Sequence, residues 1–144
     1  MSFFNLGNLI TKNARQYPEN VLFASKEERL TYAEANREIN RISNWLENKG
    51  IKHGDRVAIL MDNRVSFGLL IFAVAKLGAI YVPINIRLHN KEIDYILHDS
   101  TPKMLITTSG FHELAKVSAE NCDVPLYLDT EIREEAQEFS AEEV

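Results

Sequence analysis

Residues 55–108 decide the fold. They begin with DRVAILM at 55–61, which is followed by an apolar stretch at 65–77 and by YVPIN at 81–85. A segment that Asn90 can cap comes next, and KMLITT at 103–108 ends the block. The pattern predicts strand, helix, strand, helix and strand with short connections. Four consecutive apolar residues at 57–60 indicate a strand buried on both faces. The predicted fold class is therefore α/β, with a mostly parallel sheet flanked by helices.

Further elements are predicted before this block. Residues 5–16 carry apolar side chains at helical spacing, and 21–25 and 30–31 are expected to pair as antiparallel strands. Thr31 starts a capping-box pattern for a helix that runs to about residue 49. The apolar residues of this helix recur at spacings of three and four, and they form one continuous apolar stripe.

A glycine and a proline give local information on two of the predicted elements. Gly50 suits the left-handed position after the long helix, and Pro83 places its strand at an edge of the sheet or in an irregular pairing.

A weaker helix at 111–119 and a short strand at 126–128 follow. We divide the chain into an α/β portion at 1–130 and an acidic tail at 131–144, which is a frayed helix or disordered.

Length, composition and net charge restrict the classes of protein to which this chain can belong. At 144 residues and 45% hydrophobic content, the chain has the size and apolar content of one folded domain. The net charge of −5 argues against a nucleic-acid partner, which requires clustered basic residues. A single cysteine, Cys122, allows no internal disulfide and fits a reducing compartment.

Targeting signals are also absent from the sequence pattern. The first six residues lack the basic and apolar regions of a signal peptide. The stretch at 67–86 is interrupted by Lys76, Gly78 and Pro83, so a buried helix followed by a strand explains it better than a membrane span. We expect a cytoplasmic protein without a transmembrane segment.

Candidate ligand-binding residues follow the predicted strands, because ligands of parallel sheets gather beyond the strands' carboxyl ends. They are Asp62, Asn63, Asn85, Arg87 and residues 107–110. Each also has a structural explanation. Asp62 or Asn63 can cap the next helix, and Asn85 and Arg87 can hold a loop or pair with Asp94.

Residues 107–110, with the sequence TTSG, resemble the start of a phosphate-binding loop. Such a loop needs several glycines and a lysine, and neither follows here, so a turn or helix cap is the better interpretation. The histidines show no metal-ligand spacing, and they are His53, His89, His98 and His112. Asp94 and Asp99 are expected at the surface, Trp45 in the core, and Cys122 has no neighbour that would activate its thiol.

Several of these stretches resemble the core motifs of adenylate-forming, or AMP-binding, enzymes. LTYAE at 30–34, with Asn40-Arg41 and Trp45-Leu46, is similar to the first motif. AKLGAIYVPIN at 75–85 is similar to the second, and GDRVAI at 54–59 fits the strand between them.

The segment after the second motif resembles the acyl-CoA synthetase branch, the long-chain fatty acid–CoA ligases in particular. The residues that carry this likeness are Arg87-Leu88, Glu92, Tyr95-Ile96-Leu97 and Asp99-Ser100. The resemblance covers about residues 5–130 and identifies the chain as an N-terminal fragment of such an enzyme.

The resemblance implies an activity for the longer enzyme. Such ligases convert a carboxylic acid and ATP to an acyl-adenylate and pyrophosphate, then transfer the acyl group to coenzyme A. ATP, Mg and coenzyme A are implied for the full-length enzyme, and its acid would be a fatty or aryl acid. The phosphate loop, adenine-binding segment, ribose-binding aspartate and C-terminal lysine would all lie beyond Val144.

We therefore assign no catalytic, cofactor-binding or metal-binding residue, and expect the fragment alone to be inactive and to bind no cofactor. Its partner is the remainder of the synthetase chain. Apolar surface on the helix at 65–77 would be exposed without that remainder, which predicts a homo-oligomer. The alternative is a stand-alone doubly wound binding or interaction module without catalysis.

Overall fold

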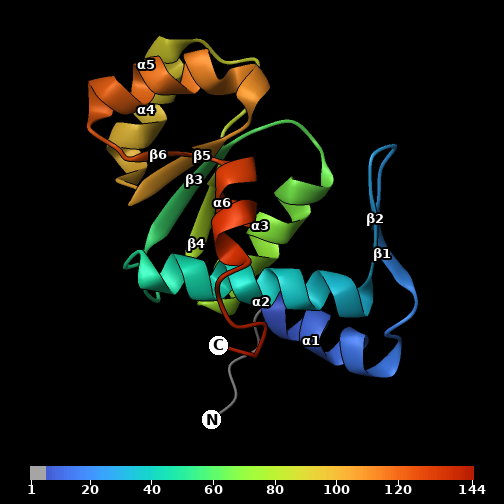
Figure 1. The fold of residues 1–144 in the computed structure, drawn as a ribbon. Coiled ribbons are helices and arrows are strands. Elements are labelled where there is room, and N and C mark those ends of the chain that lie inside the picture. The colour runs from blue at the N-terminus through green and yellow to red at the C-terminus, as the bar shows by residue number, and fades with distance from the viewer. Residues whose placement is uncertain (1–5) are drawn as a thin grey trace.

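The computed structural model describes residues 6–144, and a four-stranded sheet in the order β4-β3-β5-β6 lies at its centre (Figure 1). Every neighbouring pair in this sheet is parallel. The strands are β3 (Arg56–Leu60), β4 (Ile80–Pro83), β5 (Met104–Thr107) and β6 (Leu126–Leu128). The predicted α/β class is confirmed, and β4, the strand that contains Pro83, is an edge strand as expected.

Helices cover both faces of the sheet (Figure 1). One layer contains α1 (Leu6–Gln16), α2 (Tyr32–Asn48), α3 (Val65–Lys76) and α6 (Asp129–Ala136). The other contains α4 (Asn90–Ser100) and α5 (His112–Cys122), which follows the short 3₁₀ turn η1 (Ser109–Phe111). The predicted antiparallel pair is the hairpin of β1 (Val21–Ala24) and β2 (Arg29–Thr31). The predicted start of α1 at Asn5 lies outside the described residues.

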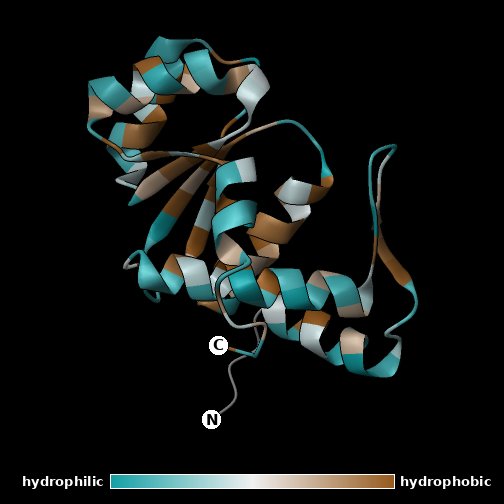
Figure 2. Ribbon diagram, in the orientation of Figure 1, coloured by the Kyte–Doolittle hydropathy of each residue, from teal (hydrophilic) through white to brown (hydrophobic). Residues whose placement is uncertain are grey.

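The central strand β3 divides the core into two parts. Val57 and Ile59 face the α1, α2, α3 and α6 layer, whereas Ala58 and Leu60 face α4 and α5. All four side chains are at most 1% exposed, and the apolar colour of the central strands is visible in Figure 2. This double burial explains why the strand has no alternating polar positions.

Helix α2 begins and ends with the motifs that the sequence predicts. The Thr31 hydroxyl accepts from the backbone N–H of Glu34 at 3.2 Å, and the Thr31 N–H donates to the Glu34 carboxylate at 3.0 Å. At the other end Gly50 has a φ of +93°, and the Ile51 N–H bonds to the Leu46 carbonyl at 3.1 Å. This is a Schellman C-cap, whose left-handed position favours glycine.

Two predicted helix caps are wrong. The N-cap residue of α3 is Arg64, without a side-chain cap bond, and neither Asp62 nor Asn63 takes that place. The N-cap of α4 is His89. Asn90 instead donates its side-chain amide to the Leu114 carbonyl at 2.8 Å, because its position faces α5.

Part of the acidic C-terminal stretch forms a helix that packs on the core. Residues 129–136 form α6, which places Ile132 and Ala136 in the core beside α2. Residues 137–144 then run along α2 (Figure 1). The glutamates predicted a solvated tail, but the apolar residues at a spacing of four form a buried face between them.

Helix α3 does not present the apolar surface that we expected from its sequence. Each of its residues is at least partly buried, since α1, α2 and the β1–β2 hairpin surround it. Exposed large apolar side chains near α3 include Leu6 and Leu9 of α1, which are 41% and 43% exposed, and Ile80 and Tyr81 of the edge strand β4, which are 50% and 36% exposed. The uncovered apolar surface therefore includes the sheet edge and not the face of α3.

Candidate functional site

The candidate site is the rim at the carboxyl ends of the strands, where parallel strands bring their following loops together. Two hollows lie at this rim, and Asp62 and Asn63 line both of them. The structure thus brings the residues after β3 to the place that the sequence predicts. It also adds residues from the β1–β2 turn and α6 that the prediction missed.

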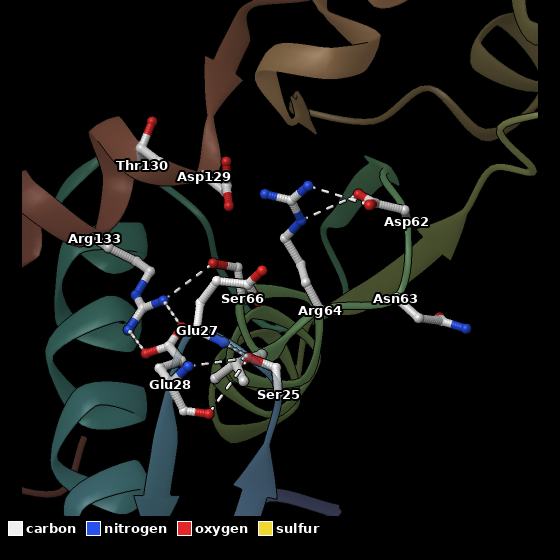
Figure 3. A pocket seen from close by; sticks show the side chains of 11 residues that line it. Ser25, Glu27, Glu28, Asp62, Asn63, Arg64, Ser66, Asp129, Thr130 and Arg133 are labelled. Atoms are coloured by element: carbon white, nitrogen blue, oxygen red, sulfur yellow. Dashed lines mark hydrogen bonds and ion pairs between the residues drawn. The ribbon is translucent and has the colours of Figure 1, made fainter.

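The first hollow, with a volume of about 520 Å³, is polar (Figure 3). It lies between the β1–β2 turn, the start of α3 and the start of α6. Its lining residues are Ser25, Glu27, Glu28, Asp62, Asn63, Arg64, Val65, Ser66, Asp129, Thr130 and Arg133.

Arg64 makes a two-bond ion pair with Asp62 in this hollow. The guanidinium Nε and Nη2 atoms each lie 3.1 Å from a carboxylate oxygen. These bonds lower the pKa of Asp62 and raise the pKa of Arg64. The pair explains why Asp62 does not cap α3, since its carboxylate is occupied by the arginine that starts the helix.

Arg133 of α6 joins three other segments. It contacts both carboxylate oxygens of Glu28 at 2.7 and 3.0 Å, a Glu38 oxygen at 2.9 Å and the Ser66 hydroxyl at 3.2 Å. Hydrogen bonding to Arg133 lowers the pKa of Glu28, and that of Arg133 is raised. The guanidinium therefore fixes the hairpin turn, α2 and α3 relative to α6.

Asp129 is a buried acid at the same place. It is 2% exposed, and Figure 3 shows it beside the Arg64 guanidinium. Its charge contributes to the raised pKa of Arg64. Arg64 thus lies near two carboxylates, and the first hollow, which is lined by four acidic side chains and two arginines, is not an open cationic site.

The second hollow, of about 700 Å³, lies between the ends of β3 and β4 and is more apolar. Its lining residues are Met61, Asp62, Asn63, Phe67, Pro83, Ile84, Asn85 and Ile86. The side-chain oxygen of Asn85 accepts a hydrogen bond from the Arg87 N–H at 2.9 Å. Asn85 therefore holds the loop, which is one of the two structural roles suggested by the sequence. The proposed partner of Arg87, Asp94, instead accepts from Asn121 at 2.9 Å.

Residues 107–110 form the end of β5 and the turn that follows it, rather than a phosphate loop. The Thr107 hydroxyl donates to the Leu60 carbonyl at 2.7 Å, which joins β5 to β3. Thr108 is fully buried, and Ser109 starts the 3₁₀ turn η1. The predicted turn is confirmed.

The other candidate residues have structural surroundings. Within residues 6–144 no group of three His, Cys, Asp or Glu side chains could hold a metal ion. Trp45 is 1% exposed and packs edge-on against Tyr127, with ring centroids 5.2 Å apart, so its predicted packing role is confirmed. Burial raises the pKa of the Cys122 thiol, which disfavours the reactive thiolate.

Sequence reasoning missed the charged residues that line the first hollow. Arg64 is two residues from Asp62, so their pairing had a local signal. Arg133 and Glu28 are 105 positions apart, and nothing in either local sequence indicates their contact. Because each arginine is held by acids of this chain, these contacts fix the loops of the rim.

The sequence profile described as "AMP-binding enzyme" matches residues 10–144. The chain is 42% identical over 104 residues to the long-chain-fatty-acid–CoA ligase FadD13 of Mycobacterium tuberculosis H37Rv, which covers 71% of this chain and 21% of the ligase. It is 41% identical over 96 residues to the crotonobetaine/carnitine–CoA ligase of Salmonella paratyphi A, covering 67% of this chain and 19% of that ligase.

A solved structure shows the same fold. The inhibitor-bound N-terminal domain of FACL13 from Mycobacterium tuberculosis superposes with a TM-score of 0.91 at 33% identity, covering 99% of this chain and 37% of that one. The chain spans about a fifth of the length of the curated relatives that it matches. Since the family profile extends over nearly all of the described residues, the chain belongs to the AMP-binding enzyme family.

Proposed function

We propose that this chain is the first part of the N-terminal domain of an acid–CoA ligase. The whole enzyme would convert a carboxylic acid, ATP and coenzyme A to acyl-CoA, AMP and pyrophosphate through an acyl-adenylate. The observation that carries the proposal is the superposition of 99% of this chain on the N-terminal domain of FACL13. The names of the relatives, a fatty-acid ligase among them, support a fatty or aryl acid as substrate.

ATP, Mg and coenzyme A would be bound by parts of the enzyme outside this chain. Residues 107–110 do not fit the phosphates of ATP, because they form a turn without a glycine-rich loop or a lysine. Adenylate formation makes the carboxylate a good acyl donor, since AMP leaves readily. The role of this chain is to supply the sheet and rim against which the remaining segments pack.

The proposal has two experimental arms. The 144-residue chain alone should give no acid-dependent ATP–pyrophosphate exchange above background with a panel of fatty and aryl acids. Full-length FadD13 serves as the positive control. Exchange by the chain alone would show that the fragment is a complete catalyst and contradict our assignment.

The second arm replaces the matching first part of FadD13 with residues 1–144 of this chain. We expect the chimera to form acyl-CoA from a long-chain acid, because the two folds superpose. Circular dichroism and thermal melting establish that the chimera is folded. A folded chimera without acyl-CoA formation would contradict the proposal.

We further propose that the enzyme is cytoplasmic and that this chain by itself forms a homo-oligomer. Of the helices within residues 6–144, none has the length and apolarity to cross a membrane. The exposed Ile80 and Tyr81 on the edge of the sheet support self-association. Light scattering tests this, and a monomer at high concentration would contradict it.

A further inference from the structure

A polar face of α2 holds the C-terminal segment, residues 137–144, which we name the C-terminal strap. Asn36, Asn40 and Asn44 recur at a spacing of four, which places them on one side of the helix. Arg41 lies next to them on the same side. The strap crosses this face after α6 ends (Figure 1).

The α2 side chains bind the main chain of the strap. Arg41, Asn40 and Asn44 donate hydrogen bonds of 2.6–3.3 Å to its carbonyl oxygens. The accepting carbonyls belong to Gln137, Phe139, Ser140, Ala141 and Glu142. Because carbonyl groups are common to all residues, these bonds recognise the peptide backbone of the strap and not its side chains.

One side chain of the strap is recognised individually. The Lys76 ammonium of α3 lies beneath the strap, and its side chain is only 3% exposed. Its Nζ atom contacts the Asn36 and Asn40 side-chain oxygens at 2.7 Å each and the Thr11 hydroxyl at 2.9 Å. The fourth contact is the Glu143 carboxylate, also at 2.9 Å.

Glu143 supplies the negative charge of this cluster. The other three contacts of Lys76 are neutral oxygens, and a buried cation is costly without an opposite charge. Burial lowers the pKa of Lys76, while bonding to Lys76 lowers the pKa of Glu143. Glu143 also accepts from Thr11, Asn36 and Asn40 at 3.1–3.3 Å, so its carboxylate is held on several sides.

We infer that α2 and Lys76 form a binding surface for a peptide segment whose anchor is a single carboxylate side chain, and that its occupant is the chain's own strap, anchored by Glu143. The asparagines and Arg41 would accept many backbones, whereas the Lys76 pocket requires an acid at one position. The surface also joins the two sequence motifs of the family resemblance, because Asn40 belongs to the first and Lys76 to the second.

Chemical labelling of lysines in the full 144-residue chain tests the inference. In the wild type, Lys76 should react slowly with an acetylating reagent, while the exposed Lys52 and Lys91 react rapidly. Glu143→Gln should raise the acetylation rate of Lys76 about tenfold or more, because the strap then opens more often. The matched control Glu142→Gln, a neighbour whose carboxylate makes no described contact, should leave the rate unchanged.

Hydrogen exchange provides a second measurement on a second variant. Lys76→Met keeps an unbranched side chain of similar length and removes the charge, and replacing a buried ion with an apolar residue is compatible with folding. Amides of residues 137–144 should then exchange several-fold faster, while those of β3 stay protected. Unchanged Lys76 labelling in Glu143→Gln, or unchanged strap exchange in Lys76→Met, would overturn the inference.

Discussion

The indole N–H of Trp45 donates to a carboxylate oxygen of Glu135 at 2.7 Å, and this bond joins α2 to α6. Trp45 is 1% exposed, so its buried N–H is left without this acceptor if Glu135 is removed. Glu135→Ala should therefore lower the free energy of unfolding by about 1–3 kcal/mol. Denaturant unfolding followed by tryptophan fluorescence measures the change.

Glu134→Ala is the control for this substitution. Glu134 is the exposed neighbour on the same helix, and its side chain makes no described contact. Its loss should change stability by less than about 0.5 kcal/mol. Equal effects of the two substitutions would show that the indole bond contributes nothing to stability.

Acid should destabilise the chain partly through Glu28. Bonding to Arg133 lowers the pKa of this carboxyl in the folded state. Its stabilising contribution is therefore complete above the unfolded-state pKa, about 4.3, and is lost as the pH falls through the lower folded-state value. Glu28→Gln should show a smaller loss of stability than the wild type between about pH 5 and pH 3.

Thermal melting at several pH values measures this difference. Glu27→Gln, at the exposed neighbouring position, should retain the acid sensitivity of the wild type. If Glu28→Gln and the wild type lose stability in parallel as the pH falls, Glu28 does not contribute to the acid response.

Gly68 of α3 lies against the ring of Phe23 in β1. A Cβ atom at this position would lie 2.5 Å from the nearest ring carbon. Gly68→Ala should consequently destabilise the chain by about 1–3 kcal/mol, although alanine is the better helix former. Phe23→Leu should restore part of the loss in the double variant, and urea unfolding measures each step.

Gly110→Ala is the matched comparison, because nothing lies within 4 Å of a Cβ atom there. It should be close to neutral. A neutral Gly68→Ala variant would mean that the hairpin moves away from α3 at little cost.

Cys122 should react slowly with iodoacetamide at neutral pH. Its thiol is partly buried, and burial raises its pKa, with a further contribution from the charge of Asp94. The fraction of reactive thiolate is therefore smaller than in free cysteine. Denaturation in urea should increase the alkylation rate, and a folded chain that reacts faster than the denatured one would contradict the prediction.

Much of the fold follows from local sequence. The apolar run at 57–60 predicts the central strand, and Pro83 predicts the edge strand, because both signals depend on burial and on backbone hydrogen bonding alone. The capping box at Thr31 is equally local, since its two bonds join residues three positions apart.

The side-chain contacts of the candidate site were harder to predict from the sequence than the fold. The rule for parallel sheets locates Asp62 and Asn63 at the rim, but their roles depend on which side chain pairs with Asp62. Arg133 reaches Glu28 across 105 positions, and only the folded chain brings them together. Helix α6 did have a sequence signal, because Ile132 and Ala136 are spaced four apart, and the surrounding glutamates obscured it.

The ion pair between Lys76 and Glu143 also determines when this region can fold during synthesis. The helices around the buried ammonium are translated first, but the charge that neutralises it lies 67 residues later in the sequence. Until the ribosome has released residue 143, the cation has three neutral partners and no counter-ion. The helical layer of α1, α2 and α3 therefore reaches its final stability only after all four strands of the sheet have been made.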